Sequence, residues 1–154
     1  MATSKKRDRT APIAGLGPHT VETLIDAGET LARRVRHETL HSPRPVFLYY
    51  IAQTFDTLTA KLSAGKRPRP ATPAHQLCLH LMIAVLEERE PGDSVLAQVR
   101  STLMPEGTHE SLAAIGRIPL RPDRSFDFVA LGDTLYGHGM GAFFAPFESD
   151  DLVA

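Results

Sequence analysis

PVFLYYIAQTFDTLTAKLSA, residues 45–64, is the stretch of sequence that decides the fold. Its large apolar residues recur at alternating steps of three and four, the spacing of a helix–helix seam: Leu48, Ile51, Phe55, Leu58 and Leu62. This spacing predicts a helix from about Pro45 to Ala64 that is closed by Gly65. We also expect Leu48, Ile51 and Phe55 of this seam to contact a partner.

Helices are predicted on both sides of this stretch. Pro18 fits the first turn of an earlier helix that runs to about Leu40, with an apolar stripe at helical spacing. Gly28 lies within that stripe, where the lack of a side chain permits close approach of a neighbouring helix. After a basic, proline-rich linker, Thr72 is a candidate N-cap for a third helix over Pro73–Arg89. Residues 77–86 of this helix are apolar almost all round, which predicts a central, buried element.

Two shorter helices are expected next. Asp93 or Ser94 caps a fourth helix that carries Val95, Leu96, Val99 and Leu103 on one face, and residues 108–116 form a short fifth helix. We expect the first three helices to form the core.

A β-hairpin is expected after Gly116. Ile118–Leu120 and Phe126–Leu131 flank a run of turn residues, and the second run alternates apolar and polar positions. The fold class is therefore mainly α, a bundle of four to five helices with a small C-terminal β-hairpin. Residues 1–17 are expected to be a flexible basic arm, residues 18–131 a single helical domain, and residues 132–154 a tail rich in glycine and phenylalanine.

Composition narrows the class of protein. The 154 residues are 42% hydrophobic and 23% charged with a net charge of −1, which is ordinary for a globular domain and gives no overall field for anionic partners. One cysteine, Cys78, excludes an intrachain disulfide, and its apolar surroundings predict a small buried side chain. No apolar stretch reaches the ~18 residues that a membrane span needs. We therefore expect a cytoplasmic protein that does not contact a membrane.

The string His37-Glu38-Thr39-Leu40-His41 matches H-E-x-x-H and resembles the catalytic helix of the zincins over these five residues. The resemblance implies zinc ligands at His37 and His41 and a general base at Glu38. However, the two histidines fall opposite the apolar stripe of their helix, beside three arginines that would oppose a bound dication. We therefore expect a solvated helix end and no cofactor, with a zinc-dependent hydrolase as an alternative.

A second alternative is a winged helix-turn-helix protein that binds DNA. The order of the third, fourth and fifth helices and the hairpin matches this class in outline. The helix that would enter the major groove, residues 108–116, has no lysine or arginine, which argues against it. The candidate nucleic-acid contacts are the basic residues of the arm, the linker and the turn: Lys5, Lys6, Arg7, Lys66, Arg67, Arg69, Arg121 and Arg124.

The leading expectation is a non-enzymatic interaction or assembly protein that engages a protein partner or its own copy. Besides the seam, the tail carries Phe143, Phe144 and Phe147, which favour burial although their segment is rich in glycine. These three rings are the remaining candidate contact residues.

Overall fold

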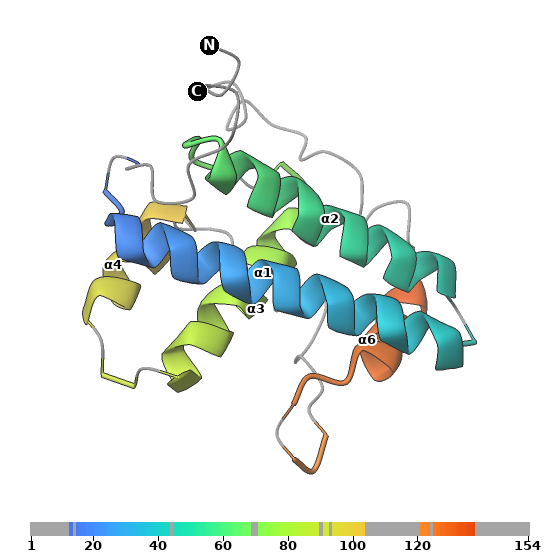
Figure 1. The fold of residues 1–154 in the computed structure, drawn as a ribbon. Coiled ribbons are helices and arrows are strands. Elements are labelled where there is room, and N and C mark those ends of the chain that lie inside the picture. Colours follow the sequence, from blue (N-terminus) through green and yellow to red (C-terminus); the bar gives the residue numbers. More distant parts are fainter. Residues whose placement is uncertain are drawn as a thin grey trace.

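The computed structural model describes residues 13, 15–43, 45–68, 71–89, 91–92, 94–103, 121–123 and 125–137. These residues are mainly helical, as the sequence predicts, and none of them lies in a β-strand (Figure 1). The elements are, in chain order, α1 (Pro18–Glu38), the 3-10 turn η2 (Thr39–His41), α2 (Pro45–Ser63), α3 (Pro73–Arg89), α4 (Ser94–Leu103) and α6 (Phe128–Gly137). None of the described helices is both long enough and apolar enough to cross a bilayer.

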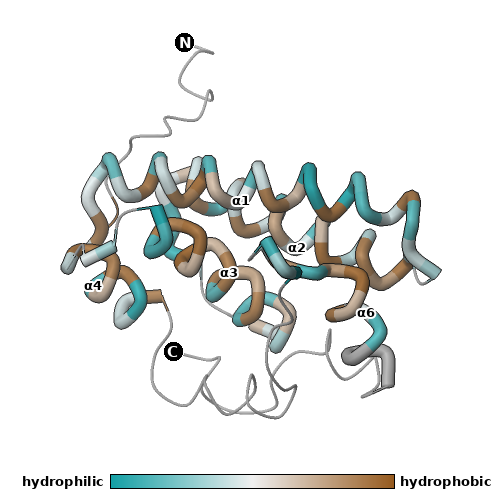
Figure 2. The backbone as a smooth tube through the Cα atoms, turned by 90° about the horizontal axis from the view of Figure 1, so that it is seen from below, coloured by the Kyte–Doolittle hydropathy of each residue, from teal (hydrophilic) through white to brown (hydrophobic). Residues whose placement is uncertain are grey.

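Helices α1 and α2 lie side by side and run in opposite directions, and α3 packs against both (Figures 1 and 2). Helix α4 lies near the start of α1, and α6 lies near the end of α1 and the start of α2. The first three helices therefore form the core, as predicted.

The crossing of the three core helices depends on Gly28. A Cβ atom at this position would lie 2.4 Å from Cγ2 of Thr59 in α2 and 3.0 Å from Cε of Met82 in α3. Only a glycine lets the three backbones come this close, which confirms the expected role of Gly28.

Helix α3 is the central element. Its residues Cys78, Leu79, Leu81, Met82 and Ile83 have no exposed surface, and they point in different directions around the helix. Figure 2 shows apolar residues along most of its length. Cys78 is the small buried side chain that the sequence predicts, and burial raises the pKa of its thiol well above the usual value.

The start of α3 is held by a local network. Oγ1 of Thr72 accepts a hydrogen bond from the His75 backbone N–H at 3.1 Å, which confirms the predicted N-cap. Nδ1 of His75 in turn accepts a hydrogen bond from the Ala71 backbone N–H at 3.3 Å. Burial and the nearby Lys61 ammonium lower the pKa of His75 below its ordinary value of 6.5.

The predicted second strand of the hairpin is wrong. Phe128–Gly137 is helix α6, and Oδ1 of Asp127 caps it by accepting a hydrogen bond from the Ala130 N–H at 3.0 Å. Packing overrides the low helix propensity of glycine here, because a Cβ on Gly132 would lie 3.2 Å from the Phe47 ring of α2. The helical domain therefore extends beyond the predicted boundary at residue 131. The predicted first strand, residues 118–120, and the predicted fifth helix, residues 108–116, lie outside the described residues.

The packed domain also begins before residue 18, the predicted boundary with the N-terminal arm. Ile13 and Leu16 are only 6% exposed and belong to the hydrophobic core, where the Leu16 N–H donates to the Ile13 carbonyl at 2.8 Å. Gly15 makes this tight turn possible with a φ of 88°. The residues just before α1 are therefore part of the packed domain rather than of a flexible arm.

Candidate functional site

The H-E-x-x-H string lies where helix geometry changes. Helix α1 ends at Glu38, and Thr39–His41 continues as one 3-10 turn. His37 and His41 are both exposed, and their rings meet edge to face with centroids 5.7 Å apart. Their position on the solvent side of α1 agrees with the sequence prediction.

Glu38 is the buried member of the string, at 6% exposure. Its Oε2 accepts a hydrogen bond from Nε of Arg34 at 3.1 Å, and its Oε1 accepts one from Nη2 of Arg121 at 2.6 Å. Both carboxylate oxygens are therefore held by guanidinium groups. A carboxylate in this arrangement serves as an electrostatic link between α1 and the segment before α6.

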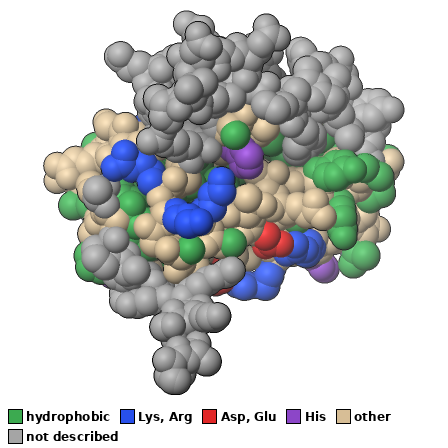
Figure 3. Space-filling view, turned by 90° about the horizontal axis from the view of Figure 1, so that it is seen from above, with side chains coloured by type: hydrophobic (Ala, Val, Ile, Leu, Met, Phe, Trp, Pro, Cys, Tyr) green, Lys and Arg blue, Asp and Glu red, His purple; other side chains and the backbone are tan. Residues whose placement is uncertain are grey.

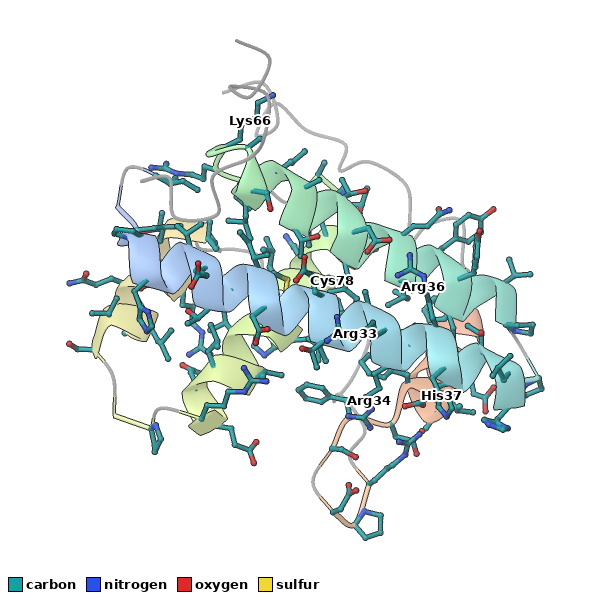
Figure 4. All side chains as sticks on the ribbon, in the orientation of Figure 1. Arg33, Arg34, Arg36, His37, Lys66 and Cys78 are labelled. Atoms are coloured by element: carbon teal, nitrogen blue, oxygen red, sulfur yellow. The ribbon has the colours of Figure 1, made fainter. Side chains whose placement is uncertain are left out.

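Arg34 makes the second half of this link. Its Nη2 donates to the Phe126 carbonyl at 2.6 Å, and its Cζ lies 5.6 Å from the centroid of the Phe128 ring, within cation–π range. Figure 4 shows Arg34 pointing from α1 toward the loop that precedes α6. We call Arg34, Glu38, Arg121, Phe126 and Phe128 the Glu38 cluster; it joins α1 to α6.

The loop that supplies Arg121 is a tight turn. The Arg121 backbone N–H donates to the Ser125 carbonyl at 2.8 Å. Oδ1 of Asp123 accepts hydrogen bonds from the Ser125 hydroxyl at 2.5 Å and from its N–H at 2.9 Å. These bonds lower the pKa of Asp123, and the hydrogen bond to Glu38 raises the pKa of Arg121. The turn therefore presents Arg121 to Glu38 in a fixed position.

The surroundings of His37 and His41 are relevant to the zinc alternative. Among the described residues, no group of three or more His, Cys, Asp or Glu side chains is placed to hold a metal ion. His37 and His41 come together as a pair, and Glu38 turns away from them into the cluster. Zinc binding by the two histidines stays a prediction.

Of the candidate nucleic-acid contacts, the structure describes Lys66, Arg67 and Arg121, which lie in two separate places. Lys66 and Arg67 are exposed after α2, and Lys66 is labelled in Figure 4. Arg121 lies in the Glu38 cluster, against the last residue of α1, whereas Lys66 and Arg67 follow the end of the antiparallel helix α2. The segment expected to form the second strand of the wing is helix α6. The remaining candidates, Lys5, Lys6, Arg7, Arg69 and Arg124, lie outside the described residues.

The seam residues Leu48, Ile51 and Phe55 are placed inside the molecule. All three have no exposed surface, because the face of α2 that carries them packs within the core. Their predicted use as partner contacts needs correction: in the folded chain they hold α2 in place. Phe143, Phe144 and Phe147, the other predicted contact residues, lie outside the described residues.

A different set of apolar residues is exposed, where α1 turns into α2. Leu40 is 75% exposed, Val46 57%, Tyr49 56% and Tyr50 46%. Figure 3 looks onto this face and shows hydrophobic side chains gathered over the start of α2. We call these four residues the end cluster. The amino-acid sequence gives a signal for this cluster, because only Asp56 and Lys61 are charged among the 19 residues of α2. The solvent-exposed face of an ordinary helix carries more charged residues than this.

Polar groups border the end cluster. Nη2 of Arg36 in α1 donates a hydrogen bond to Oδ2 of Asp56 in α2, and this ion-paired hydrogen bond raises the pKa of Arg36. An exposed apolar centre with a charged border is the composition of a protein–protein contact surface.

Comparisons of the chain with protein-family models, with curated proteins and with solved structures gave no match.

Proposed function

We propose that this protein is a non-enzymatic helical interaction protein, a small accessory or assembly subunit that binds a protein partner or its own copy through the end cluster. The observation that carries the proposal is the exposure of Leu40, Val46, Tyr49 and Tyr50 together on one end of a well-packed domain. Single exposed apolar side chains are common on folded proteins, but four large ones gathered at one end of a domain indicate a contact surface.

The chemistry of the end cluster suits binding. Tyrosine is enriched at protein interfaces because its ring gives a large contact area and its hydroxyl can still find a polar partner. Tyr49 and Tyr50, about half exposed, each leave roughly 100 Å² of ring surface available to a partner.

The surface beneath the end cluster is rigid. Phe47 and Leu48 of the same helical turns have no exposed surface, and Phe47 packs against Gly132 of α6. Tyr49 and Tyr50 therefore project from a fixed support, so little backbone order has to be gained on binding.

Site-specific photocrosslinking in cells tests this function. A photoreactive phenylalanine analogue replaces Tyr49 in one variant and exposed Glu22, on the outer face of α1, in a matched control. The proposal expects a discrete crosslinked product from position 49, absent from position 22, and lost when Leu40→Ser and Val46→Ser are added. Equal crosslinking from both positions, or none from either, would overturn it.

A further inference from the structure

We infer that the outer face of α2 is a homodimerisation surface on which a second copy of this chain docks with its own α2 antiparallel. The inference rests on the proposed function and names its partner. It starts from a contrast between two neighbouring helices. The outer face of α1 carries charges, with Glu22, Asp26, Arg33 and Arg36 all exposed, as a solvent-facing helix requires.

The outer face of α2 carries no charged residue on its central stripe. Its central stripe follows separations of four, three, four, three and four residues: Val46, Tyr50, Gln53, Thr57, Ala60 and Ala64. Ala60 is half-buried and the other five are exposed. Ala64 continues the helical path beyond Ser63, because its N–H donates to the Ala60 carbonyl at 3.1 Å. This is the heptad spacing with which one helix packs along another.

The second heptad stripe of α2 is already occupied. Leu48, Ile51, Phe55, Leu58 and Leu62 follow the same kind of spacing and are buried in this domain. Helix α2 therefore carries two packing stripes, and among the described residues the inner one is buried whereas the outer one is largely exposed.

Residue size along the outer stripe identifies the second copy as the occupant. The large residues Val46 and Tyr50 occupy one half of the stripe, and the small residues Ala60 and Ala64 occupy the other half. In an antiparallel pair centred on residue 55, Val46 meets Ala64 of the other copy, Tyr50 meets Ala60, and Gln53 meets Thr57. Each large side chain then faces a small one, and one two-fold axis generates all contacts twice. A parallel pair would set Tyr50 against Tyr50 and leave a gap between the alanines.

Charge and area agree with this pairing. Asp56 and Lys61 lie beside the stripe rather than on it, and Asp56 is paired with Arg36 of its own chain, so docking brings no unpaired like charges together. Val46, Tyr49 and Tyr50 leave on the order of 300 Å² exposed per copy before the smaller residues are counted. An interface built on this area belongs to the weak, reversible class rather than to permanent dimers.

The test uses the full chain and two charge variants. Gln53→Glu with Thr57→Glu brings four carboxylates together at the two-fold axis, whereas Gln53→Glu with Thr57→Lys places each glutamate against a lysine of the other copy. Both variants change the same two exposed residues, so neither disturbs the core, and circular dichroism checks that the helices are retained. Sedimentation velocity over a concentration series measures the dimer.

The midpoint of dimerisation, the protein concentration at which half of the parent chains are in dimers, is expected at roughly 10–100 µM. The double-glutamate variant should raise this midpoint by about tenfold or more, and the glutamate–lysine variant should return it to within about threefold of the parent value. Any one of three results overturns the inference. The parent protein stays monomeric up to roughly 1 mM, the double-glutamate variant leaves the midpoint unchanged, or the glutamate–lysine variant fails to restore the parent midpoint.

A disulfide test reads the orientation directly. Val46→Cys with Ala64→Cys places two thiols about 27 Å apart within one helix, too far to bond to each other, but opposite each other in the antiparallel pair. Mild oxidation should give a covalent dimer. The control Glu22→Cys with Arg33→Cys, on the outer face of α1, should stay monomeric, and equal crosslinking of both pairs contradicts the inference. A monomeric chain that still photocrosslinks another protein from position 49 removes the inference alone; a monomeric chain with no photocrosslink removes the proposed function as well.

Discussion

Glu38 and Arg121 are 83 positions apart in the sequence, and Nη2 of Arg121 donates to Oε1 of Glu38 at 2.6 Å. The same carboxylate accepts from Arg34 one helical turn earlier in α1. One buried acidic side chain thus ties the loop before α6 to the first helix.

Replacing Glu38 by alanine should lower the free energy of unfolding by about 1–3 kcal/mol, because Arg34 and Arg121 lose their shared acceptor. The loss falls below that of a fully buried ion pair, since the two arginine side chains are 29% and 34% exposed and water replaces part of the interaction. Urea unfolding measures the change, and the exposed Glu22→Ala serves as a control that should stay within about 0.5 kcal/mol. Equal stability of the two variants would mean that the Glu38 cluster does not hold α6.

Replacing Gly28 by alanine should destabilise the domain by about 1–3 kcal/mol, although alanine favours helix over glycine. The new Cβ would meet Thr59 Cγ2 at 2.4 Å, so α1 and α2 would have to separate. Adding Thr59→Ser removes that methyl group and keeps a hydroxyl that can donate to the Asp56 carbonyl, so the double variant should recover most of the loss. Thermal unfolding of both variants checks this; a double variant no better than Gly28→Ala alone contradicts the assigned clash.

Stability should fall in mild acid through His75. Burial and Lys61 lower the pKa of this imidazole in the folded chain, so below about pH 6.5 the unfolded chain takes up a proton that the folded chain resists. The free energy of unfolding therefore rises with pH from the lowered pKa of the folded state up to about 6.5, and it levels off above that value. Protonation at Nδ1 would also remove the acceptor for the Ala71 N–H.

Urea unfolding at a series of pH values measures this dependence. His75→Gln cannot take up the proton and should flatten the profile in that window, whereas His19→Gln, at an exposed position near the start of α1, controls for the loss of a histidine. Identical profiles for the parent chain and His75→Gln would exclude His75 as the source.

His37→Ala with His41→Ala should change the free energy of unfolding by no more than about 0.5 kcal/mol, because both side chains are exposed and remote from the core. Thermal unfolding with and without added zinc, together with elemental analysis of the purified chain, provides the measurement. Stoichiometric zinc in the parent chain that is lost in the double variant would reinstate the zincin-like reading of the string.

Local chemistry in the sequence was enough to locate α1, α2, α3 and α4. The starts of α1, α2 and α3 follow from Pro18, Pro45 and Pro73, and α4 starts at Ser94, one of its two predicted caps. These features act within a turn or two of the backbone, so they operate in the same way before the chain has folded. For the same reason the burial of Cys78 and the close approach at Gly28 could be predicted from their apolar surroundings.

Tertiary packing decided three features that the sequence alone could not. Phe128–Gly137 becomes a helix because Asp127 caps it and the Phe47 ring fills the space beside Gly132, although alternation favoured a strand. Glu38 is buried because its carboxylate pairs with Arg121, which belongs to a turn far away in the sequence.

Helix α2 shows the third feature. Its sequence carries two packing stripes, and only the positions of α1, α3 and α6 decide that Phe55 faces inward while Tyr50 faces outward. Helix periodicity is a local property of the chain, whereas burial of a helix face depends on elements that pack against it from elsewhere in the sequence. The sequence by itself therefore determined the first four helices, and the folded structure determined α6 and the exposed surface.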